Sequence, residues 1–321
     1  VNANKRWVGG HMNPRYPIYI VSKGRWKSRL TVKALERMRV PYSIVVEQSE
    51  YDEYANVIDK DKILVLPQKY LDEYDTFDDL GDTKSKGPGA ARNFCWQHSI
   101  DQGFARVWIF DDNIHEFHRL HANMKTPVRT GATFAAAEDF VDRYENVYIA
   151  GFNYYSFCKT TSNALPYKLN TRIYSCLLIK NDINYRFRGR YNEDTDLSLR
   201  ILKDGFCTIQ YNAFLAGKTT TQRMGGGNFL DFYSKEGTGP KSKMLKEMHP
   251  DVTEVVDKFS RIHHEVDYKP FAKNKLILKK GIVVPSGTNE YGMTLIDGKM
   301  NRQEEEKALA KENETNLTAV E

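Results

Sequence analysis

Two carboxylates and an amide, Asp111, Asp112 and Asn113, directly follow the apolar run Val107–Phe110. The run predicts a buried strand, and open α/β sheets bind ligands in the loops at the carboxyl ends of their strands. Carboxylate oxygens in such a loop suit a hard divalent cation that shares its other coordination positions with a substrate diphosphate. The same residue types are also typical of a tight turn or a helix cap, so the cluster by itself leaves both interpretations open.

A second acidic group, Glu193, Asp194 and Asp196, opens a predicted helix over 194–203. The helix dipole favours anions at this end. Glu193 and Asp194 are expected in the preceding loop, where a carboxylate can act as a base or orient an acceptor. The three acids are therefore the candidate catalytic residues. N-capping by Asp194, with the other acids solvated, is the structural alternative.

Small residues and one arginine make up the segment Lys86–Asn93, which precedes the acidic pair. Its glycines and alanines let a helix N-terminus approach a ligand closely. Arg92 can donate forked hydrogen bonds to a phosphate or a carboxylate. Neither the Walker pattern nor the dinucleotide fingerprint is present, so helix-start residues with a structural Arg92 are the alternative.

Polar residues also follow the first two predicted strands. Ser22, Lys23 and Arg25 come after the first strand, and Glu47 ends the second. In a nucleotide-binding sheet these positions meet the base, the ribose or the diphosphate. Taken singly, the four residues are more typical of ordinary surface loops.

The C-terminal third contains a glycine run and a histidine pair. Gly226 and Gly227 lie in a stretch preceded by hydroxyls and an arginine, which is suited to cradling a phosphate. His263 and His264 are adjacent, and one member of such a pair can ligate a metal. A flexible loop and two structural histidines are the alternatives. The sequence has no HExxH or paired CxxC motif, which argues against a zinc hydrolase.

The elements that must position these residues alternate short apolar runs with amphipathic stretches from Arg15 to Ala216. This alternation predicts an α/β fold with a mixed, mainly parallel sheet flanked by helices. Predicted strands cover 18–21, 42–47, 63–66, 107–110, 147–149, 174–179 and 207–211. Predicted helices run from a Ser28 cap to Pro41 and over 90–102, 134–144 and 194–203.

Composition excludes several classes of protein. The chain has 321 residues with 40% apolar content, which excludes a mostly disordered protein, and no apolar run approaches a membrane span. Four scattered cysteines predict buried free thiols and a cytosolic location.

The net charge of +5 permits a polyanionic partner. Thirteen basic and eight acidic residues lie between Gly217 and Lys280, so that segment contains much of the excess.

Three motifs follow one another along the chain: Gly87–Asn93, Asp111–Asn113, and Asn192–Leu197 with Gly205 downstream. In this order they resemble the motifs of GT-A glycosyltransferases, nearest the family-two group. Three C-terminal segments, Lys218–Asn228, His249–Val252 and Arg261–Tyr268, look like those of the TET-associated glycosyltransferases of bacteriophages. The resemblance covers most of the chain from Pro17 to Leu278. It implies a GT-A-type, Rossmann-like sheet with a C-terminal acceptor-binding extension.

The same resemblance implies a hexosyl- or pentosyltransferase that moves glucose, arabinose or a similar sugar from a UDP-sugar to 5-hydroxymethylcytosine or a related pyrimidine in double-stranded phage DNA. A Mn²⁺ or Mg²⁺ ion would bridge Asp112 and the diphosphate, with Asp111 near the ribose and His263 or His264 completing the metal shell. Arg92 would face the donor, and Glu193 or Asp194 the acceptor. The triplet is Asp-Asp-Asn rather than Asp-x-Asp, which leaves the metal ligands open.

The expected domain division is an expression-vector remnant over 1–12, a catalytic core over 13–216, an acceptor-binding extension over 217–290 and a charged tail over 291–321. We expect no membrane contact, no obligate protein partner and a location in the cytoplasm, of the host cell if the chain is phage-encoded. Two alternatives remain at this point. One is a GT-A enzyme acting on a polysaccharide or protein, and the other is a nucleotide- or DNA-binding module without catalysis.

Overall fold

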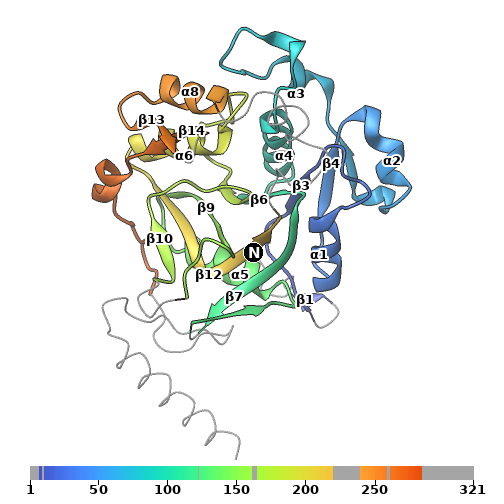
Figure 1. Ribbon diagram of the computed structural model, residues 1–321. Helices are drawn as coiled ribbons and strands as arrows, with labels where there is room; N and C mark the ends of the chain where they lie inside the picture. The colour runs from blue at the N-terminus through green and yellow to red at the C-terminus, as the bar shows by residue number, and fades with distance from the viewer. Residues whose placement is uncertain are drawn as a thin grey trace, which may run out of the picture.

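The computed structural model of this protein describes residues 7–8, 11–121, 123–160, 165–219, 239–258 and 261–283. A ten-stranded sheet crosses these residues in the order β5-β4-β3-β6-β11-β9-β12-β7-β8, with β10 paired to β12 (Figure 1). The sheet is mixed and is flanked by helices, as the sequence predicts. A separate two-stranded ribbon joins β1 (Trp7–Val8) to β2 (His11–Met12).

The first half of the sheet is parallel. Strand β3 pairs with both β4 and β6, and β4 pairs with β5, all in the parallel sense. The carboxyl ends of these strands therefore lie along one edge of the sheet. The elements of this half are β3 (Ile18–Val21), α1 (Leu30–Met38), β4 (Ser43–Val46), η2 (Gln48–Glu50), α2 (Tyr51–Ala55), η3 (Lys60–Lys62), β5 (Ile63–Val65), α3 (Gln68–Asp72), η4 (Gly81–Thr83), α4 (Gly89–Asp101) and β6 (Arg106–Asp111).

The second half adds mostly antiparallel neighbours. Strand β11 pairs antiparallel with β6 and β9, and β12 pairs antiparallel with β7 but parallel with β9. This half consists of β7 (Ile114–His121), β8 (Met124–Pro127), α5 (Ala132–Val141), β9 (Val147–Tyr154), β10 (Tyr167–Leu169), β11 (Cys176–Lys180), α6 (Glu193–Lys203) and β12 (Cys207–Lys218).

Alternating side chains of the strands fill two separate cores. Ile18 and Ile20 of β3 pack on the face covered by α1 and α5, whereas Tyr19 packs on the face covered by α4 and α6. Side chains alternate in this way because successive residues of a strand point to opposite faces. The layers are thus helices, sheet and helices. All four cysteines are buried free thiols, which confirms that prediction.

The C-terminal elements pack on α6 rather than on the sheet. They are α8 (Gly239–Met248), a hairpin of β13 (Thr253–Lys258) and β14 (Arg261–Val266), and the short helix η7 (Lys269–Lys273). An apolar cluster joins them to α6 through Leu199, Leu202, Leu245, Val252 and Phe271. Figure 1 shows α8, β13 and β14 beside α6. A hydrogen bond from Asn192 Nδ2 to the carbonyl of Lys241 (2.7 Å) also ties the extension to the acidic start of α6.

Three local features differ from the sequence-based expectations. Helix α1 is not capped by Ser28 as predicted: it begins after Arg29, whose backbone is in the left-handed region. The Ser28 hydroxyl donates to the carbonyl of Arg25 rather than accepting from a helix amide. Strands β7 and β8 were not predicted, because their mixed polar sequence lacks a clear apolar alternation. Strand β12 continues to Lys218, beyond the predicted end at residue 211.

Among the helices of the described ranges, none combines the length and the apolar character that a membrane span needs.

Candidate active site

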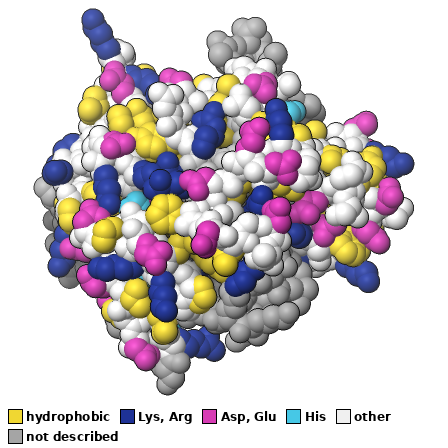
Figure 2. All heavy atoms as spheres, turned by 90° about the horizontal axis from the view of Figure 1, so that it is seen from above, with side chains coloured by type: hydrophobic (Ala, Val, Ile, Leu, Met, Phe, Trp, Pro, Cys, Tyr) yellow, Lys and Arg dark blue, Asp and Glu magenta, His cyan; other side chains and the backbone are white. Residues whose placement is uncertain are grey.

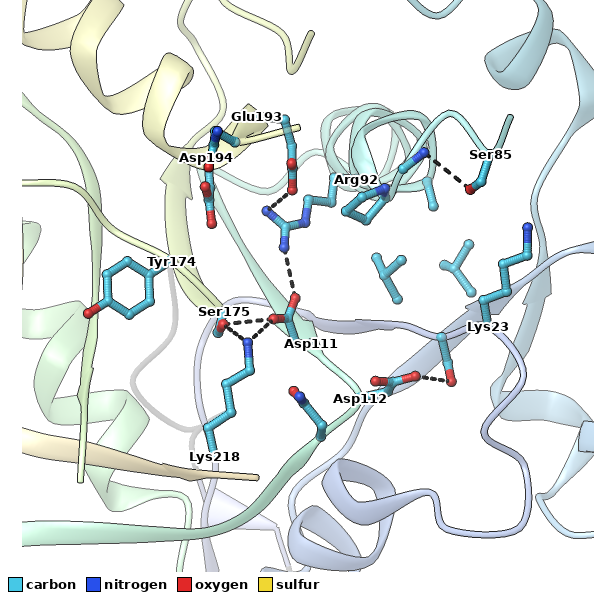
Figure 3. A pocket seen from close by; sticks show the side chains of 18 of the residues that line it. Lys23, Ser85, Arg92, Asp111, Asp112, Tyr174, Ser175, Glu193, Asp194 and Lys218 are labelled. Carbon is cyan, nitrogen blue, oxygen red and sulfur yellow. Dashed lines mark hydrogen bonds and ion pairs between the residues drawn. The ribbon is translucent and has the colours of Figure 1, made fainter. Parts of the chain in front are cut away.

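A cavity of about 380 Å³ opens at the carboxyl ends of β3, β4 and β6. The last residues of these strands, Val21, Val46 and Asp111, line it. Its volume is in the range of small-molecule sites, and its position is the one where open α/β sheets bind ligands. Figure 3 shows that side chains from both halves of the sheet point into this space.

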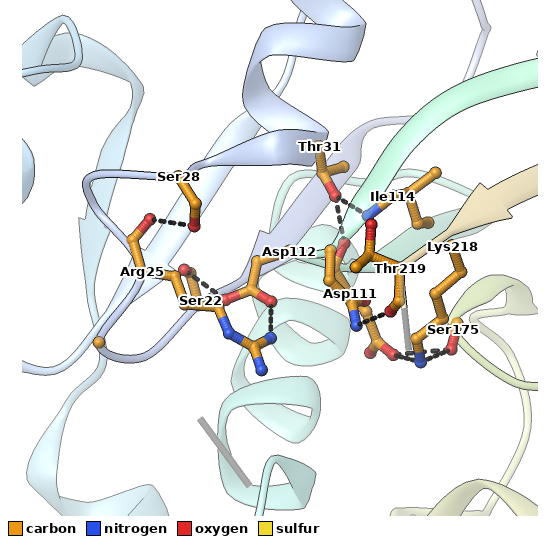
Figure 4. Close-up of polar contacts among 12 residues, drawn as sticks. Ser22, Arg25, Ser28, Thr31, Asp111, Asp112, Ile114, Ser175, Lys218 and Thr219 are labelled. Atoms are coloured by element: carbon orange, nitrogen blue, oxygen red, sulfur yellow. Dashed lines mark hydrogen bonds and ion pairs between the residues drawn. The ribbon is translucent and has the colours of Figure 1, made fainter. Parts of the chain in front are cut away.

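The acidic turn after β6 is fixed by helix α1 and by the end of β12. The Thr31 hydroxyl donates to the Asp111 carbonyl (2.6 Å) and accepts from the Ile114 amide (2.9 Å). Asn113 Nδ2 donates to the carbonyl of Thr219 (3.0 Å), and the Thr219 amide donates to the Asn113 carbonyl (3.0 Å). Figure 4 shows the two Asp carboxylates directed to different sets of partners. The turn therefore presents two separate carboxylates rather than one pair.

Asp112 is engaged by the loop that follows β3. Ser22 Oγ donates to its Oδ2 (2.7 Å), and Arg25 Nη1 forms an ion pair with its Oδ1. The Tyr54 hydroxyl supports this loop by binding both Ser22 Oγ (2.6 Å) and the Arg25 amide (3.1 Å). Asp112 is 5% exposed, and this burial raises its pKa even though Arg25 and Ser22 stabilise the charged form.

Asp111 lies at the centre of a second group, which we call the Asp111 cluster and which also contains Arg92, Ser175 and Lys218. Arg92 Nη2 donates to Oδ1 (2.8 Å), while Ser175 Oγ (2.7 Å) and Lys218 Nζ (2.8 Å) donate to Oδ2. Burial alone would raise the pKa of Asp111, but the charges of Lys218 and Arg92 together outweigh it and lower that pKa. Asp111 is therefore ionised at neutral pH.

Arg92 joins the Asp111 cluster to α6. Its Nη1 lies 3.0 Å from Glu193 Oε1, and its side chain is 3% exposed. Among the described residues, neither Nε nor Nη1 has a partner with hydrogen-bond geometry. Buried N–H groups without acceptors are costly. The guanidinium thus lies in the cavity wall and links the Asp111 carboxylate to that of Glu193.

The segment before Arg92 needs glycine for a packing reason. A Cβ at Gly89 would lie 1.8 Å from the Tyr74 hydroxyl, which itself donates to the carbonyl of Gly189 (2.8 Å). Glycine at this position lets the first turn of α4 sit against that tyrosine. The close approach brings Pro88 and Gly87 to the cavity wall.

Glu193 and Asp194 begin α6, and both line the cavity. Asn192, in a left-handed conformation, donates from Nδ2 to the carbonyl of Lys241 (2.7 Å) and so ties this start to α8. Asp194 Oδ1 accepts from the Thr195 amide (2.7 Å) and hydroxyl (3.3 Å). In the described part of the chain its Oδ2 has no hydrogen-bond partner. Burial raises the pKa of Glu193, against the opposing charge of Arg92.

At the opposite end of the cavity, Lys23 Nζ lies 3.0 Å from Glu47 Oε1. These two side chains are more exposed than those of the Asp111 cluster. The pair is placed by the ends of the neighbouring strands β3 and β4. It supplies both a donor and an acceptor of hydrogen bonds to a ligand.

Basic and aromatic residues line the side of the cavity nearest the C-terminal extension. They include Arg172, Tyr174, Lys241 and His264. The Arg172 guanidinium lies 5.2 Å from the centre of the Tyr174 ring. Burial lowers the pKa of Lys241, and burial together with the charges of Lys241 and Arg172 lowers that of His264 to about 4.

The depressed pKa of His264 predicts a loss of stability in acid. Its imidazole takes up a proton in the unfolded chain near pH 6.5 but resists protonation in the fold until about pH 4. Stability is therefore complete above pH 6.5 and falls as the pH drops, by about 2 kcal/mol at pH 5. Urea unfolding at pH 7 and pH 5 should show a smaller drop for His264→Gln than for wild type. The exposed His121→Gln is the matched control, and an equal drop in all three proteins would contradict the assignment.

A divalent metal held by Asp111, Asp112 and a histidine does not fit these residues. Both carboxylates are already bonded to cationic side chains, and His264 Nδ1 faces Ser242 Oγ (3.3 Å). His263 is the neighbour of His264 on β14 and so points to the other face of the hairpin, away from the cavity lining. In the ranges described here, no group of three or more His, Cys, Asp or Glu side chains could hold a metal ion.

Asp196 does not reach the cavity, in contrast to its predicted catalytic role. It is completely buried and binds Arg200 Nε (2.8 Å), Arg188 Nη2 (3.2 Å) and His249 Nε2 (3.0 Å). Asp194 and Asp196 are two residues apart on a helix, so their side chains cannot face the same direction. Asp196 instead links α6 to the end of α8.

Loss of the Asp196 charge is expected to destabilise the fold. Asp196→Asn would leave a group of buried or half-buried cations without their shared carboxylate, which costs about 3 kcal/mol. Chemical denaturation measures this change. Asp204→Asn, near the exposed end of α6, is the control and should shift the free energy of unfolding by less than about 0.5 kcal/mol.

Several cavity residues were not among the predicted site residues, and two predicted ones cannot be placed. Gly226 and Gly227 lie outside the described residues. Ser175 was missed because it is a single polar residue inside the strand predicted over 174–179, and Lys218 because it lies beyond the strand predicted to end at residue 211. Lys218 directly follows the run Phe214–Gly217, so its position at a strand end was the available signal.

The lysines of the basic C-terminal segment have different environments. Lys241 lines the cavity, Lys243 is exposed, and Lys246 Nζ binds Glu254 (3.0 Å) and the carbonyl of Pro250 (3.1 Å). Figure 2 shows basic and acidic side chains interspersed over the face seen from above. On this face the basic and acidic side chains of the described residues do not separate into one basic patch.

The chain matches one family of known proteins over most of its length. The family model of the TET-associated glycosyltransferases matches residues 16–227. No curated protein matches the chain. Among solved structures, a protein described as mannose-1-phosphate geranyltransferase from Thermus thermophilus is 9% identical, with a TM-score of 0.27. That match covers 73% of this chain and 64% of the other.

Proposed function

Because this chain belongs to the TET-associated glycosyltransferase family, a family of transferases that act on modified DNA, we propose that it moves a sugar from a UDP-sugar to 5-hydroxymethylcytosine in DNA. The observation that carries the proposal is the placement of Arg92 between Asp111 and Glu193 in the cavity wall. A guanidinium so placed can bind a diphosphate, while carboxylates beside it can serve an acceptor hydroxyl. We expect the sugar to be a hexose or a pentose.

The donor is expected to extend along the strand ends from Lys23 to Arg92. Lys23 and Glu47 lie where a nucleoside reaches the ends of β3 and β4, and they can bind its base or ribose. The first turn of α4 and the positive charge of Arg92 in the cavity wall suit the diphosphate. Ser22 and Arg25 support this region indirectly, because they hold Asp112.

Asp194 is the residue that we assign as the base. Its Oδ2 is available in the cavity, whereas Glu193 is bound to Arg92. Asp194 accepts the proton of the acceptor hydroxyl while that oxygen bonds to the anomeric carbon of the sugar. The bond from this carbon to the diphosphate oxygen breaks, and the electron pair leaves with UDP. Glu193 acts by positioning Arg92.

The acceptor is expected to enter beside the C-terminal extension, over residues 217–290. Arg172 and Lys241 can bind DNA phosphates there, and such contacts weaken steeply with salt. A sugar and a diphosphate need room around the hydroxymethyl group, which favours a base flipped out of the helix. Phe157 lines the cavity with 60% of its surface exposed and is placed to stack on that base.

A divalent metal has no step in this proposal, because Asp111 and Asp112 are bound to Arg92, Lys218 and Arg25. A Mn²⁺ or Mg²⁺ ion, where a glycosyltransferase binds one, neutralises the departing diphosphate. Here Arg92 and Lys218 are the cationic groups next to the carboxylate that such an ion would use.

Mass spectrometry of nucleosides tests the proposed reaction. The protein is incubated with 5-hydroxymethylcytosine DNA and a panel of nucleotide sugars, with manganese or with chelator, before the DNA is digested. We expect a mass increase of one sugar on hydroxymethylcytosine and none on unmodified cytosine. Transfer to a polysaccharide or protein instead would assign a different acceptor. Absence of transfer from every donor to every acceptor would favour a non-catalytic binding module.

A further inference from the structure

Lys218 is a mostly buried lysine to which the proposed reaction assigns no step. It is the last residue of β12, and its side chain is 14% exposed at the cavity wall. Its ammonium donates to Asp111 Oδ2 (2.8 Å), Ser175 Oγ (2.6 Å) and the Tyr154 hydroxyl (3.1 Å). An ammonium has three N–H groups, so the protein holds this one in place without any ligand.

The surroundings of this ammonium are those of a bound cation. All three partners are oxygens, and one is a carboxylate that also binds Arg92. Burial would lower the pKa of Lys218, but the charge of Asp111 outweighs burial and raises it, so the group remains charged. The positive charge is therefore fixed in position before a substrate arrives, as electrostatic stabilisation of a developing anion requires.

Lys218 also opposes binding of a metal at the same carboxylate. A Mg²⁺ ion about 2.1 Å from Asp111 Oδ2 would lie within about 5 Å of Nζ, which is itself 2.8 Å from that oxygen. Two like charges at this separation repel strongly at a buried site. The lysine and a divalent ion are thus alternatives at this position, and the lysine is supplied by the chain.

We propose that the Lys218 ammonium replaces the divalent cation and stabilises the departing diphosphate, so that donor binding and transfer need no metal. This inference rests on the proposed function in one respect, that the cavity takes a nucleoside diphosphate. The longest of the three bonds, to the Tyr154 hydroxyl, is the one that a phosphate oxygen replaces. The carbon–oxygen bond to the diphosphate breaks toward UDP, and the lysine keeps its proton throughout.

Calorimetric binding of UDP and of uridine, each with EDTA and with Mn²⁺, tests the inference without any sugar transfer. Wild type is expected to bind UDP equally well in both conditions. Lys218→Met should weaken UDP binding by about 10- to 100-fold, the range for one charge-assisted contact, and leave uridine binding unchanged. Lys180→Met, which removes a lysine paired with Asp182 outside the cavity, is the matched control and should bind like wild type.

Wild-type binding of UDP that requires Mn²⁺ would overturn the inference, as would Lys218→Met binding UDP like wild type. Failure of wild type to bind UDP or any other nucleoside diphosphate would overturn it as well. If Lys218→Met does not fold, the double variant Lys218→Met/Asp111→Asn removes both charges of the pair, and it should show the same loss of preference for UDP over uridine. Metal-free UDP binding that depends on Lys218, without transfer to hydroxymethylcytosine, would support the inference while refuting the proposed acceptor.

Discussion

Asp194→Asn is expected to reduce kcat for sugar transfer by about 10³-fold, within the range for loss of a general base. The amide has the size of the carboxylate and still offers an oxygen to the Thr195 amide, so the start of α6 is kept. It cannot accept the proton of the acceptor hydroxyl. Single-turnover assays with hydroxymethylcytosine DNA measure the loss, and calorimetry with UDP should show unchanged donor affinity.

Two comparisons make this result specific to Asp194. Asp182→Asn alters an exposed carboxylate at the end of β11 and should leave kcat unchanged. Glu193→Gln should lower kcat/KM through weaker positioning of Arg92 and change donor binding as well, a pattern different from that of Asp194→Asn. Asp194→Asn with at least a tenth of wild-type kcat would refute its assignment as the base.

Arg92→Lys is expected to impair both activity and stability, although it preserves the charge. The guanidinium reaches Asp111 and Glu193 with two different nitrogens, and the single ammonium of a lysine cannot reproduce that fork. We expect kcat/KM to fall by about 10²- to 10³-fold, as on losing a preorganised donor. The free energy of unfolding should decrease by about 3 kcal/mol, because a buried carboxylate loses its partner.

Steady-state kinetics and chemical denaturation on the same samples measure these two effects. Arg186→Lys is the matched control, because Arg186 lies against Trp96 of α4 but outside the cavity lining. It should leave kcat/KM within about twofold, since it touches no proposed substrate contact. Arg92→Lys with wild-type kcat/KM would show that the fork does not contact the donor.

Much of the parallel half of the sheet was predictable, and for a physical reason. Buried strands such as Ile18–Val21 and Arg106–Asp111 are short apolar runs that end at polar loops, and strand ends of this kind meet at one edge. The resemblance to glycosyltransferases implied that Arg92, Asp111 and Asp194 share one site, and the structure brings all three to the same cavity. The antiparallel strands β7 and β8 lack that apolar signal.

Position along a helix explains why Asp196 was misassigned. Glu193, Asp194 and Asp196 lie within four positions of the sequence, and nothing in that stretch distinguishes their roles. Once α6 forms, the helical rotation turns Asp196 into the protein, toward Arg188 and Arg200, while Asp194 faces the cavity. The direction of each side chain depended on where the helix begins, which capping patterns locate only to within one or two residues.

The chemistry available at the edge of this sheet could be predicted without the structure, because apolar runs and the polar residues that end them are local features of the chain. Which charges neutralise one another depends on the folded arrangement of the strands. Lys218 is 107 residues from Asp111, and β12 brings it there only by pairing with β9 and β7 in the folded sheet. The local sequence predicts that the Asp111 carboxylate is a metal ligand, but in the fold it is bound to the cationic side chains of Arg92 and Lys218. Long-range strand pairing, which no local pattern encodes, sets the electrostatics of the site.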